Sequence, residues 1–231
     1  MKIFGEPKSF KGHEVSLIQN FICTTDFRLN LLKTIVPKWA ETLNPYPVVV
    51  NYDSNINVDE VYSLYDKYFD NLHFQQDMGK EWREPVQDFF DITDSPYLLY
   101  LCEDYTFAPE LTREKFLNIL DEYKSEQCSH LMLTRVRKYT ELKWHTKSRR
   151  GKNLWLYHSS ESPYDSFPAA GLIERDLYKD SLKDAPGMGL SGLDIQERSG
   201  MKHRDVMCCC LIEKLMDHEQ PTGTAQRHAK K

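Results

Sequence analysis

The sequence predicts an α/β fold in which helices cover both faces of a mostly parallel central sheet. Two observations carry this prediction: short apolar runs alternate with segments of helical periodicity, and several of these runs end in acidic or amide residues. Strands that are joined through helices pair in parallel, with right-handed crossovers that place helices on both faces. Polar residues at the strand ends are therefore expected at one edge of the sheet, where open α/β sheets bind ligands.

The first half of the chain supplies four strands and three helices to this prediction. Apolar runs predict strands at residues 15–23, 48–52 and 71–76, and a fourth strand directly before Glu103. The valines at 48–50 are typical of a strand that is covered on both faces. Apolar residues recur at helical spacing over 29–39, 58–68 and 82–93, and Thr24, Thr25 and Asp26 offer an N-cap for the first of these helices.

The second half is less regular. We predict a helix at 111–123, a strand at 130–136, and a hairpin between 136–142 and 153–158. Small residues at 169–173 predict a further strand that leads into a helix starting at Glu174. Residues 186–192 are dense in glycine and are expected to form a mobile loop. Residues 193–218 are predicted to be helical, with their buried side formed by Met207, Leu211, Leu215 and Met216.

Composition excludes several classes of protein. The chain has 231 residues, of which 40% are hydrophobic and 28% charged, as in a globular domain. Its net charge of −5 argues against a nucleic-acid partner. The N-terminus lacks the features of a signal peptide, and no apolar run approaches the roughly 20 residues of a membrane span. We therefore expect a cytoplasmic protein with reduced cysteines, since its six cysteines lack paired CxxC spacing.

The most informative segment is the strand that runs directly into Glu103 and Asp104, followed by Pro109. Two carboxylates at the carboxyl edge of a sheet are suited to hold a divalent cation against a phosphorylated ligand. Acidic residues after a strand are also common turn chemistry, so the pair alone leaves a solvated turn as an alternative.

The order of the polar motifs resembles the GT-A glycosyltransferases, and within them the family 2-like enzymes that use nucleotide-sugar donors. The resemblance covers residues 15–109 well and the rest loosely. It rests on four sites in order, which are Thr24 to Arg28, Asn51 to Asn55, Asp77 to Arg83, and Cys102-Glu103-Asp104 with Phe107-Ala108-Pro109 behind it. The last site stands where the family has its Asp-x-Asp motif, and Cys102 departs from that motif at the first Asp.

The resemblance implies a Rossmann-like GT-A fold and a bound Mn²⁺ or Mg²⁺, with Asp104 as the metal ligand. It also implies that the nucleotide-diphospho-sugar donor is contacted by Thr24, Asp26, Arg28, Asp53, Lys80, Arg83 and Glu103. Alternatives stay open for some of these residues. Asp26 and Arg28 also fit a helix cap with a local ion pair, and Arg83 also fits a solvated helix residue.

An inverting transferase needs a carboxylate base for the acceptor hydroxyl, which belongs to a glycan or another alcohol. By resemblance we expect Asp194 in this role, with Glu197 as the second choice, although Asp194 is equally suited to cap a helix. We expect a single domain over residues 1–218, with a nucleotide-binding half at about 13–110, an acceptor half at about 111–218, and a disordered tail at 219–231.

Three rival functions follow from the same residues. Cys102 in place of the first Asp, together with the small number of acidic residues in the predicted site, fits a GT-A-like domain that binds nucleotide or glycan without catalysis. Another doubly wound nucleotide-phosphate enzyme is disfavoured, because the stretch from Phe21 to Arg28 contains no glycine. The basic segment from Lys138 to Lys152 fits an interaction module that grips an anionic partner, and high salt would weaken that contact.

Overall fold

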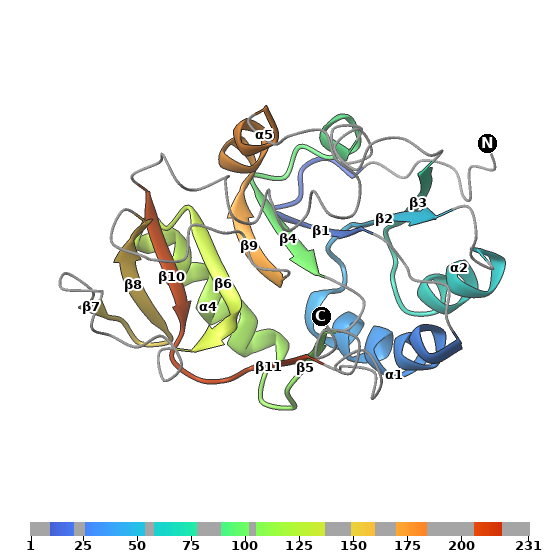
Figure 1. The fold of residues 1–231 in the computed structure, drawn as a ribbon, viewed down its shortest axis with the longest axis horizontal. Coiled ribbons are helices and arrows are strands. Elements are labelled where there is room, and N and C mark those ends of the chain that lie inside the picture. The colour runs from blue at the N-terminus through green and yellow to red at the C-terminus, as the bar shows by residue number, and fades with distance from the viewer. Residues whose placement is uncertain are drawn as a thin grey trace, which may run out of the picture.

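The computed structural model of the chain describes residues 10–20, 26–53, 58–77, 89–101, 105–136, 149–159, 170–183 and 206–218. Nine of the described strands form one sheet in the order β3-β2-β1-β4-β9-β6-β10-β8-β7 (Figure 1). They are β1 (Val15–Asn20), β2 (Val48–Asp53), β3 (Leu72–Asp77), β4 (Tyr97–Leu101), β6 (His130–Val136), β7 (Arg149–Arg150), β8 (Leu154–His158), β9 (Ala170–Glu174) and β10 (Met207–Leu211).

The predicted fold class is confirmed, because the sheet is mixed but mostly parallel. β1 pairs in parallel with β2 and β4, and β2 does so with β3. β9 interrupts this order, since it lies between β4 and β6 and pairs antiparallel with both. Beyond it, β10 is parallel to β6, and only β8 is again reversed.

Helices cover both faces of the sheet, as the alternation of strand side chains requires. On one face Leu17 and Leu99 are buried against α1 (Asp26–Leu43), α2 (Val58–Asp66) and α4 (Arg113–Ser125). On the other face Ile18 and Leu98 are buried with residues of the helical segment 89–92 and of α5 (Arg175–Lys183). Figure 1 shows α5 apart from the other three helices. The helices predicted at 29–39, 58–68, 111–123 and from Glu174 are therefore confirmed.

The helix predicted over 193–218 is wrong in its described part. Residues 206–218 contain β10 and a second short strand, β11 (Met216–His218), which pairs antiparallel with β5 (Tyr105–Phe107). The run Met-Cys-Cys-Cys-Leu has no alternation that distinguishes a strand from a buried helix. Its place between β6 and β8 decides the outcome, because there the backbone pairs on both sides.

The hairpin predicted between 136–142 and 153–158 stays a prediction, because residues 137–142 lie outside the described residues. Within the described residues, β8 pairs antiparallel with β10 along its whole length and with β7 at Trp155 and Leu156.

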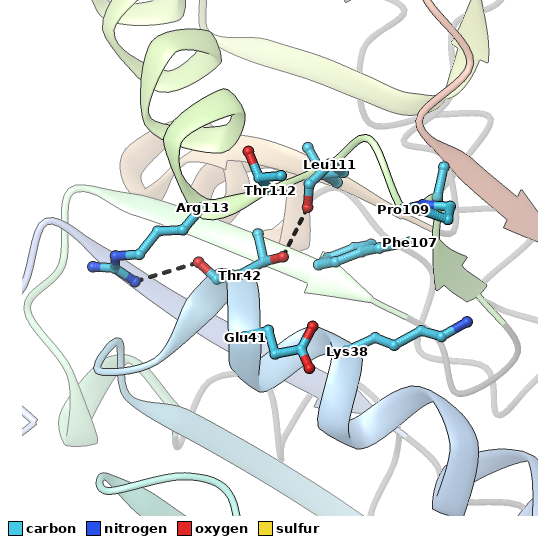
Figure 2. Close-up of a pocket in the computed structure, with 9 residues that line it drawn as sticks. Lys38, Glu41, Thr42, Phe107, Pro109, Leu111, Thr112 and Arg113 are labelled. Carbon is cyan, nitrogen blue, oxygen red and sulfur yellow. Dashed lines mark hydrogen bonds between the residues drawn. The ribbon is translucent and has the colours of Figure 1, made fainter.

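The start of α4 is tied to the end of α1 (Figure 2). The buried Thr42 hydroxyl donates to the Leu111 carbonyl at 2.9 Å, and Arg113 Nη1 donates to the Thr42 carbonyl at 3.3 Å. The Thr112 side chain caps α4 by accepting from the Lys115 backbone N–H at 3.2 Å. These bonds satisfy polar groups at the facing helix ends and fix the segment that leads from β5 into α4.

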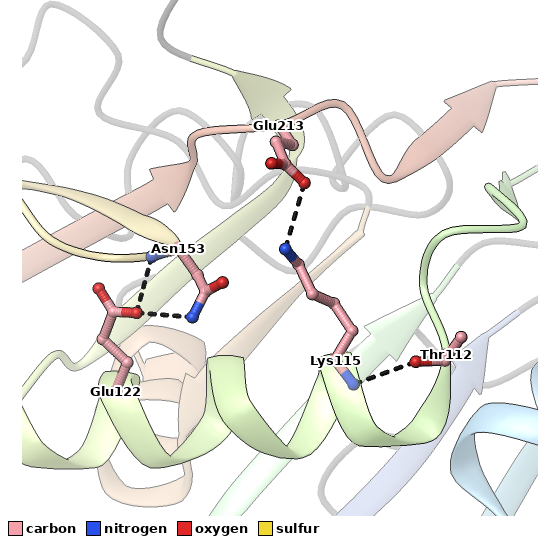
Figure 3. A network of polar contacts seen from close by, with 5 residues as sticks. All are labelled: Thr112, Lys115, Glu122, Asn153 and Glu213. Carbon is pink, nitrogen blue, oxygen red and sulfur yellow. Dashed lines mark hydrogen bonds and ion pairs between the residues drawn. The ribbon is translucent and has the colours of Figure 1, made fainter.

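A single carboxylate on α4 holds the turn that joins β7 to β8 (Figure 3). Glu122 Oε1 accepts from the backbone N–H groups of Lys152 and Leu154 at 2.8 and 3.2 Å. Glu122 Oε2 accepts from the backbone N–H and the side-chain amide of Asn153 at 2.8 and 2.9 Å. Gly151 lies so close that a Cβ added there would overlap the Glu122 carboxylate.

Gly151→Ala is therefore expected to lower the free energy of unfolding by about 1–2 kcal/mol, because the new methyl group displaces the carboxylate from its backbone donors. The same change should cost much less in a Glu122→Ala background, where the overlap is gone. Denaturant unfolding of the two single variants and the double variant measures this coupling. Asp121→Ala, an exposed neighbour on α4, serves as the control, and additive effects would contradict the assignment.

Candidate functional site

The ends of the parallel strands gather at one edge of the sheet. Asn20, the last residue of β1, is in register with Asn51, and Asp53, the last residue of β2, is in register with Asp77 at the end of β3. β4 runs in the same direction and ends at Leu101. The carboxyl edge therefore carries amide and acidic residues, as the sequence predicted.

Three of the predicted site residues lie at this edge by their backbone positions. Asp53 closes β2, and Asp26 and Arg28 belong to the first turn of α1, which follows β1. The other predicted residues lie outside the described part of the chain, so their prediction is untested: Thr24, Lys80, Arg83, Glu103, Asp104, Asp194 and Glu197. In the sequence, Glu103 and Asp104 belong to the connection between Leu101, the last residue of β4, and Tyr105, the first residue of β5.

The β5–β11 pair adds residues that the sequence analysis missed. Register places Asp217 opposite Thr106 and His218 opposite Tyr105, the first residue after Asp104. Trp39 Nε1 donates to the Tyr105 carbonyl at 3.1 Å and so ties β5 to α1. The alternation Met216-Asp217-His218 after an apolar run is the signal for this strand, and the prediction of a helix there concealed it.

One buried polar side chain lies just below the edge. Gln19 precedes the last residue of β1, is fully buried, and accepts a hydrogen bond through Oε1 from the Tyr65 hydroxyl on α2. Its Nε2 group has no hydrogen-bond acceptor among the described residues. This amide lies among the apolar side chains of one core face, such as Leu17 and Val50.

The buried thiols are not part of this edge. Cys128, Cys208, Cys209 and Cys210 are free cysteines of the β6–β10 region. Burial raises the pKa of the Cys208 and Cys209 thiols, so both stay protonated and behave as small apolar side chains. The expectation of reduced cysteines is confirmed for these four.

A cavity of about 340 Å³ lies between α1 and the segment that joins β5 to α4 (Figure 2). Its wall includes Phe107, Pro109 and Leu111 opposite Lys38 and Glu41. Lys38 lies about 18 Å along the helix axis from Asp26, at 1.5 Å per residue. This cavity is therefore separate from the start of α1, where the nucleotide contacts are predicted.

Two features are absent from the described ranges. No three His, Cys, Asp or Glu side chains within these ranges are arranged as a metal site, and Glu103 and Asp104 lie outside them. None of the helices in the same ranges combines the length and the hydropathy of a membrane-crossing segment.

The comparisons with known proteins agree with the fold. No family model and no curated protein matches the sequence. Among solved structures, S. aureus TarS 1-349 in complex with UDP-GlcNAc superposes with a TM-score of 0.57 at 11% identity, over 91% of this chain and 60% of that one. The mannosyltransferase PcManGT from Pyrobaculum calidifontis, in complex with GDP-Man and Mn²⁺, gives 0.53 at 12% identity, over 93% and 59%.

A longer TarS structure gives a TM-score of 0.61 at 10% identity, and this chain covers 37% of it. The chain thus spans less than two thirds of the length of each of these proteins. Identities this low establish the architecture alone. The chain has the GT-A-like fold of these glycosyltransferases.

Proposed function

We propose that this chain is a glycosyltransferase of the family 2-like type, which moves a hexosyl or related sugar from a nucleotide-diphospho-sugar to an acceptor hydroxyl with inversion. The observation that carries the proposal is the shared carboxyl edge of the sheet, where β1, β2 and β4 end and where Asp53 closes β2. The GT-A-like neighbours, solved with UDP-GlcNAc and with GDP-Man and Mn²⁺, support the choice of donor class.

The proposed contacts to the nucleotide-sugar donor come from residues at or after the ends of β1, β2 and β3. Asp53, at the end of β2, is suited to bind the base or ribose. The proposed nucleotide contacts also include Asp26 and Arg28 of the first turn of α1, and Thr24, which precedes this helix in the sequence. Lys80 and Arg83 follow β3, whose end is in register with that of β2. Their cationic side chains match the two phosphates, and Arg can bind a phosphate through two parallel hydrogen bonds.

The predicted metal fits the chemistry of the residues between β4 and β5. Mn²⁺ and Mg²⁺ prefer oxygen ligands and need few protein carboxylates, because water and phosphate oxygens complete their coordination. Asp104 is the proposed ligand, with Glu103 toward the ribose. When bound, the cation stabilises the charge that grows on the leaving diphosphate.

The proposed base, Asp194, lies near the middle of the connection between α5 and β10. Both α5, which follows the end of β9, and the start of β10 lie at the amino edge of the sheet. At least 10 residues separate Asp194 from each of these elements, enough for about 35 Å of extended chain. A five-residue strand is about 17 Å long, so chain length allows Asp194 to reach the carboxyl edge. Glu197 has the same freedom and remains the second choice.

The proposal is tested by thermal denaturation of the protein with UDP, GDP and the other nucleoside diphosphates, each with and without Mn²⁺. Binding to the native state alone raises the melting temperature by mass action, so one base is expected to raise it in a metal-dependent way. Hydrolysis of the matching nucleotide-sugar then separates an enzyme from a domain that only binds. If no nucleotide raises the melting temperature under either condition, the proposed function is wrong.

A further inference from the structure

Two cysteine side chains lie close together at the end of α4. Cys128 follows α4, and the next residue, Ser129, donates its backbone N–H to the Met207 carbonyl at 2.8 Å, which joins this segment to β10. Cys209, in the middle of β10, donates from Sγ to the His130 carbonyl at 3.5 Å. The residues that follow Cys128 are thus fixed to the part of β10 that carries Cys209.

Among the three consecutive cysteines of β10, Cys209 lies on the same side of the sheet as Cys128. Successive residues of a strand point to opposite faces. Cys209 is buried with Cys128 in the core on the α4 side, whereas Cys208 and Cys210 are buried in the core on the other face. The Cys209 thiol is also in hydrogen-bonding contact with the Cys128 thiol. The fold therefore brings the sulfur atoms of Cys128 and Cys209 together.

The surroundings of this pair keep both sulfur atoms away from water. Cys128 is 1% exposed and Cys209 is fully buried. Tyr123 of α4 lies beside them, and its buried hydroxyl has no hydrogen-bond partner within the described residues. Burial, followed by the contact with Cys128, raises the pKa of the Cys209 thiol, so little of it is ionised at neutral pH. Fast redox sensors use exposed thiols of low pKa, so this pair is not suited to react directly with peroxide.

Slow exchange with a small disulfide is the oxidation that such a pair can undergo, because local opening exposes buried groups for short times. One thiol, as the thiolate, attacks a sulfur of oxidised glutathione, which releases one glutathione and leaves a mixed disulfide on the protein. The second thiol then attacks this mixed disulfide, forms the protein disulfide and releases the other glutathione. Both thiol protons end on glutathione, and the two electrons reduce its disulfide.

We infer that Cys128 and Cys209 are a reversible oxidation site, at which a disulfide links the end of α4 to the middle of β10. A disulfide brings its sulfur atoms to about 2.05 Å, and for two thiols in contact the required movement is rotation about their Cα–Cβ bonds. The bridge closes a loop of about 80 residues, and long loops give the largest stabilisation by constraint of the unfolded chain. The inference is independent of the proposed transferase activity.

The test is incubation of the reduced protein with oxidised glutathione, followed by alkylation of the remaining thiols and digestion with trypsin. Cleavage after lysine and arginine leaves Cys128 in the peptide 125–135 and Cys209 in the peptide 205–214. We expect a disulfide between these two peptides in the mass spectrum. The oxidised protein should melt about 5–10 °C above the reduced protein, and dithiothreitol should reverse this shift.

Three alanine variants locate the bridge, because the peptide 205–214 contains three cysteines. Cys209→Ala should form no link to the peptide 125–135, and oxidised glutathione should not raise its melting temperature. Cys208→Ala and Cys210→Ala are the matched controls, since they remove neighbouring buried thiols from the other face and should keep both the link and the shift. Where an alanine variant does not fold, the serine variant provides the same comparison.

Alkylation of the native protein by iodoacetamide sets the length of the incubation, because it measures how fast Cys128 and Cys209 become accessible. The inference is overturned if the two peptides stay unlinked after an oxidation several times longer than this alkylation, or if the product is only a mixed disulfide with glutathione. It is also overturned if Cys209→Ala keeps the link, or if Cys208→Ala or Cys210→Ala loses it, since another thiol would then be the partner of Cys128.

Discussion

Asp194→Asn is expected to lower the rate of sugar transfer by about 10² to 10⁴-fold, the usual contribution of a general base. Affinity for the donor should change by no more than about threefold, because the base acts on the proton of the acceptor. The amide keeps the shape of the side chain but cannot take up the proton. The measurement is release of the nucleoside diphosphate from the donor identified by thermal denaturation, with a panel of hydroxyl acceptors, together with donor affinity by calorimetry.

Asparagine separates the two roles that the sequence allows for Asp194. It caps helices nearly as well as aspartate, so a residue that only caps a helix would tolerate the change. Wild-type turnover in Asp194→Asn would therefore refute the base assignment. Glu197→Gln, three residues further on, is the parallel variant, and a large loss there alone would move the role to Glu197.

Asp104→Asn is expected to abolish the part of nucleotide binding that depends on Mn²⁺. The amide preserves the size of the side chain but removes the negative charge that holds a divalent cation. The melting temperature without ligand should stay within about 2 °C of the wild type, since an exchange that keeps the size and shape of a polar side chain is expected to change stability by less than about 0.5 kcal/mol. Calorimetric titration of the nucleoside diphosphate, with and without Mn²⁺, measures the loss.

Glu103→Gln is the neighbouring control. If Glu103 contacts the ribose, its variant should weaken nucleotide binding to a similar extent with and without Mn²⁺. A metal dependence in Asp104→Asn equal to that of the wild type would refute the metal assignment. A metal dependence lost in Glu103→Gln instead would transfer the role to that carboxylate.

The first half of the fold was predictable because its signals are local. β2 begins with three valines and ends at Asp53, and the buried side of α1 includes Leu32, Ile35 and Trp39. β10 was not predictable in this way, because an apolar run of five residues fits a buried helix as well as a strand. Only its pairing with β6 and β8, both distant in sequence, selects the strand.

The candidate site likewise has a part that the sequence predicts and a part that only long-range strand pairing determines. Parallel strands place Asp53 and the end of β4 at one edge whatever the details, so this much follows from the order of the elements. The juxtaposition of Thr106 with Asp217 comes from strands that are far apart along the chain. No local pattern in the sequence encodes this pairing.

The position of β9 has a consequence for the order in which the molecule can be assembled. β4 pairs with β9 along one edge, and β9 pairs with β6 along the other, although β6 precedes β9 in the chain. During synthesis from the N-terminus, β4 and β6 emerge first and keep open edges until residues 170–174 arrive between them. Open edges invite pairing with other chains, so the nascent protein depends on the late docking of β9, and then of β10 between β6 and β8, to become one continuous sheet.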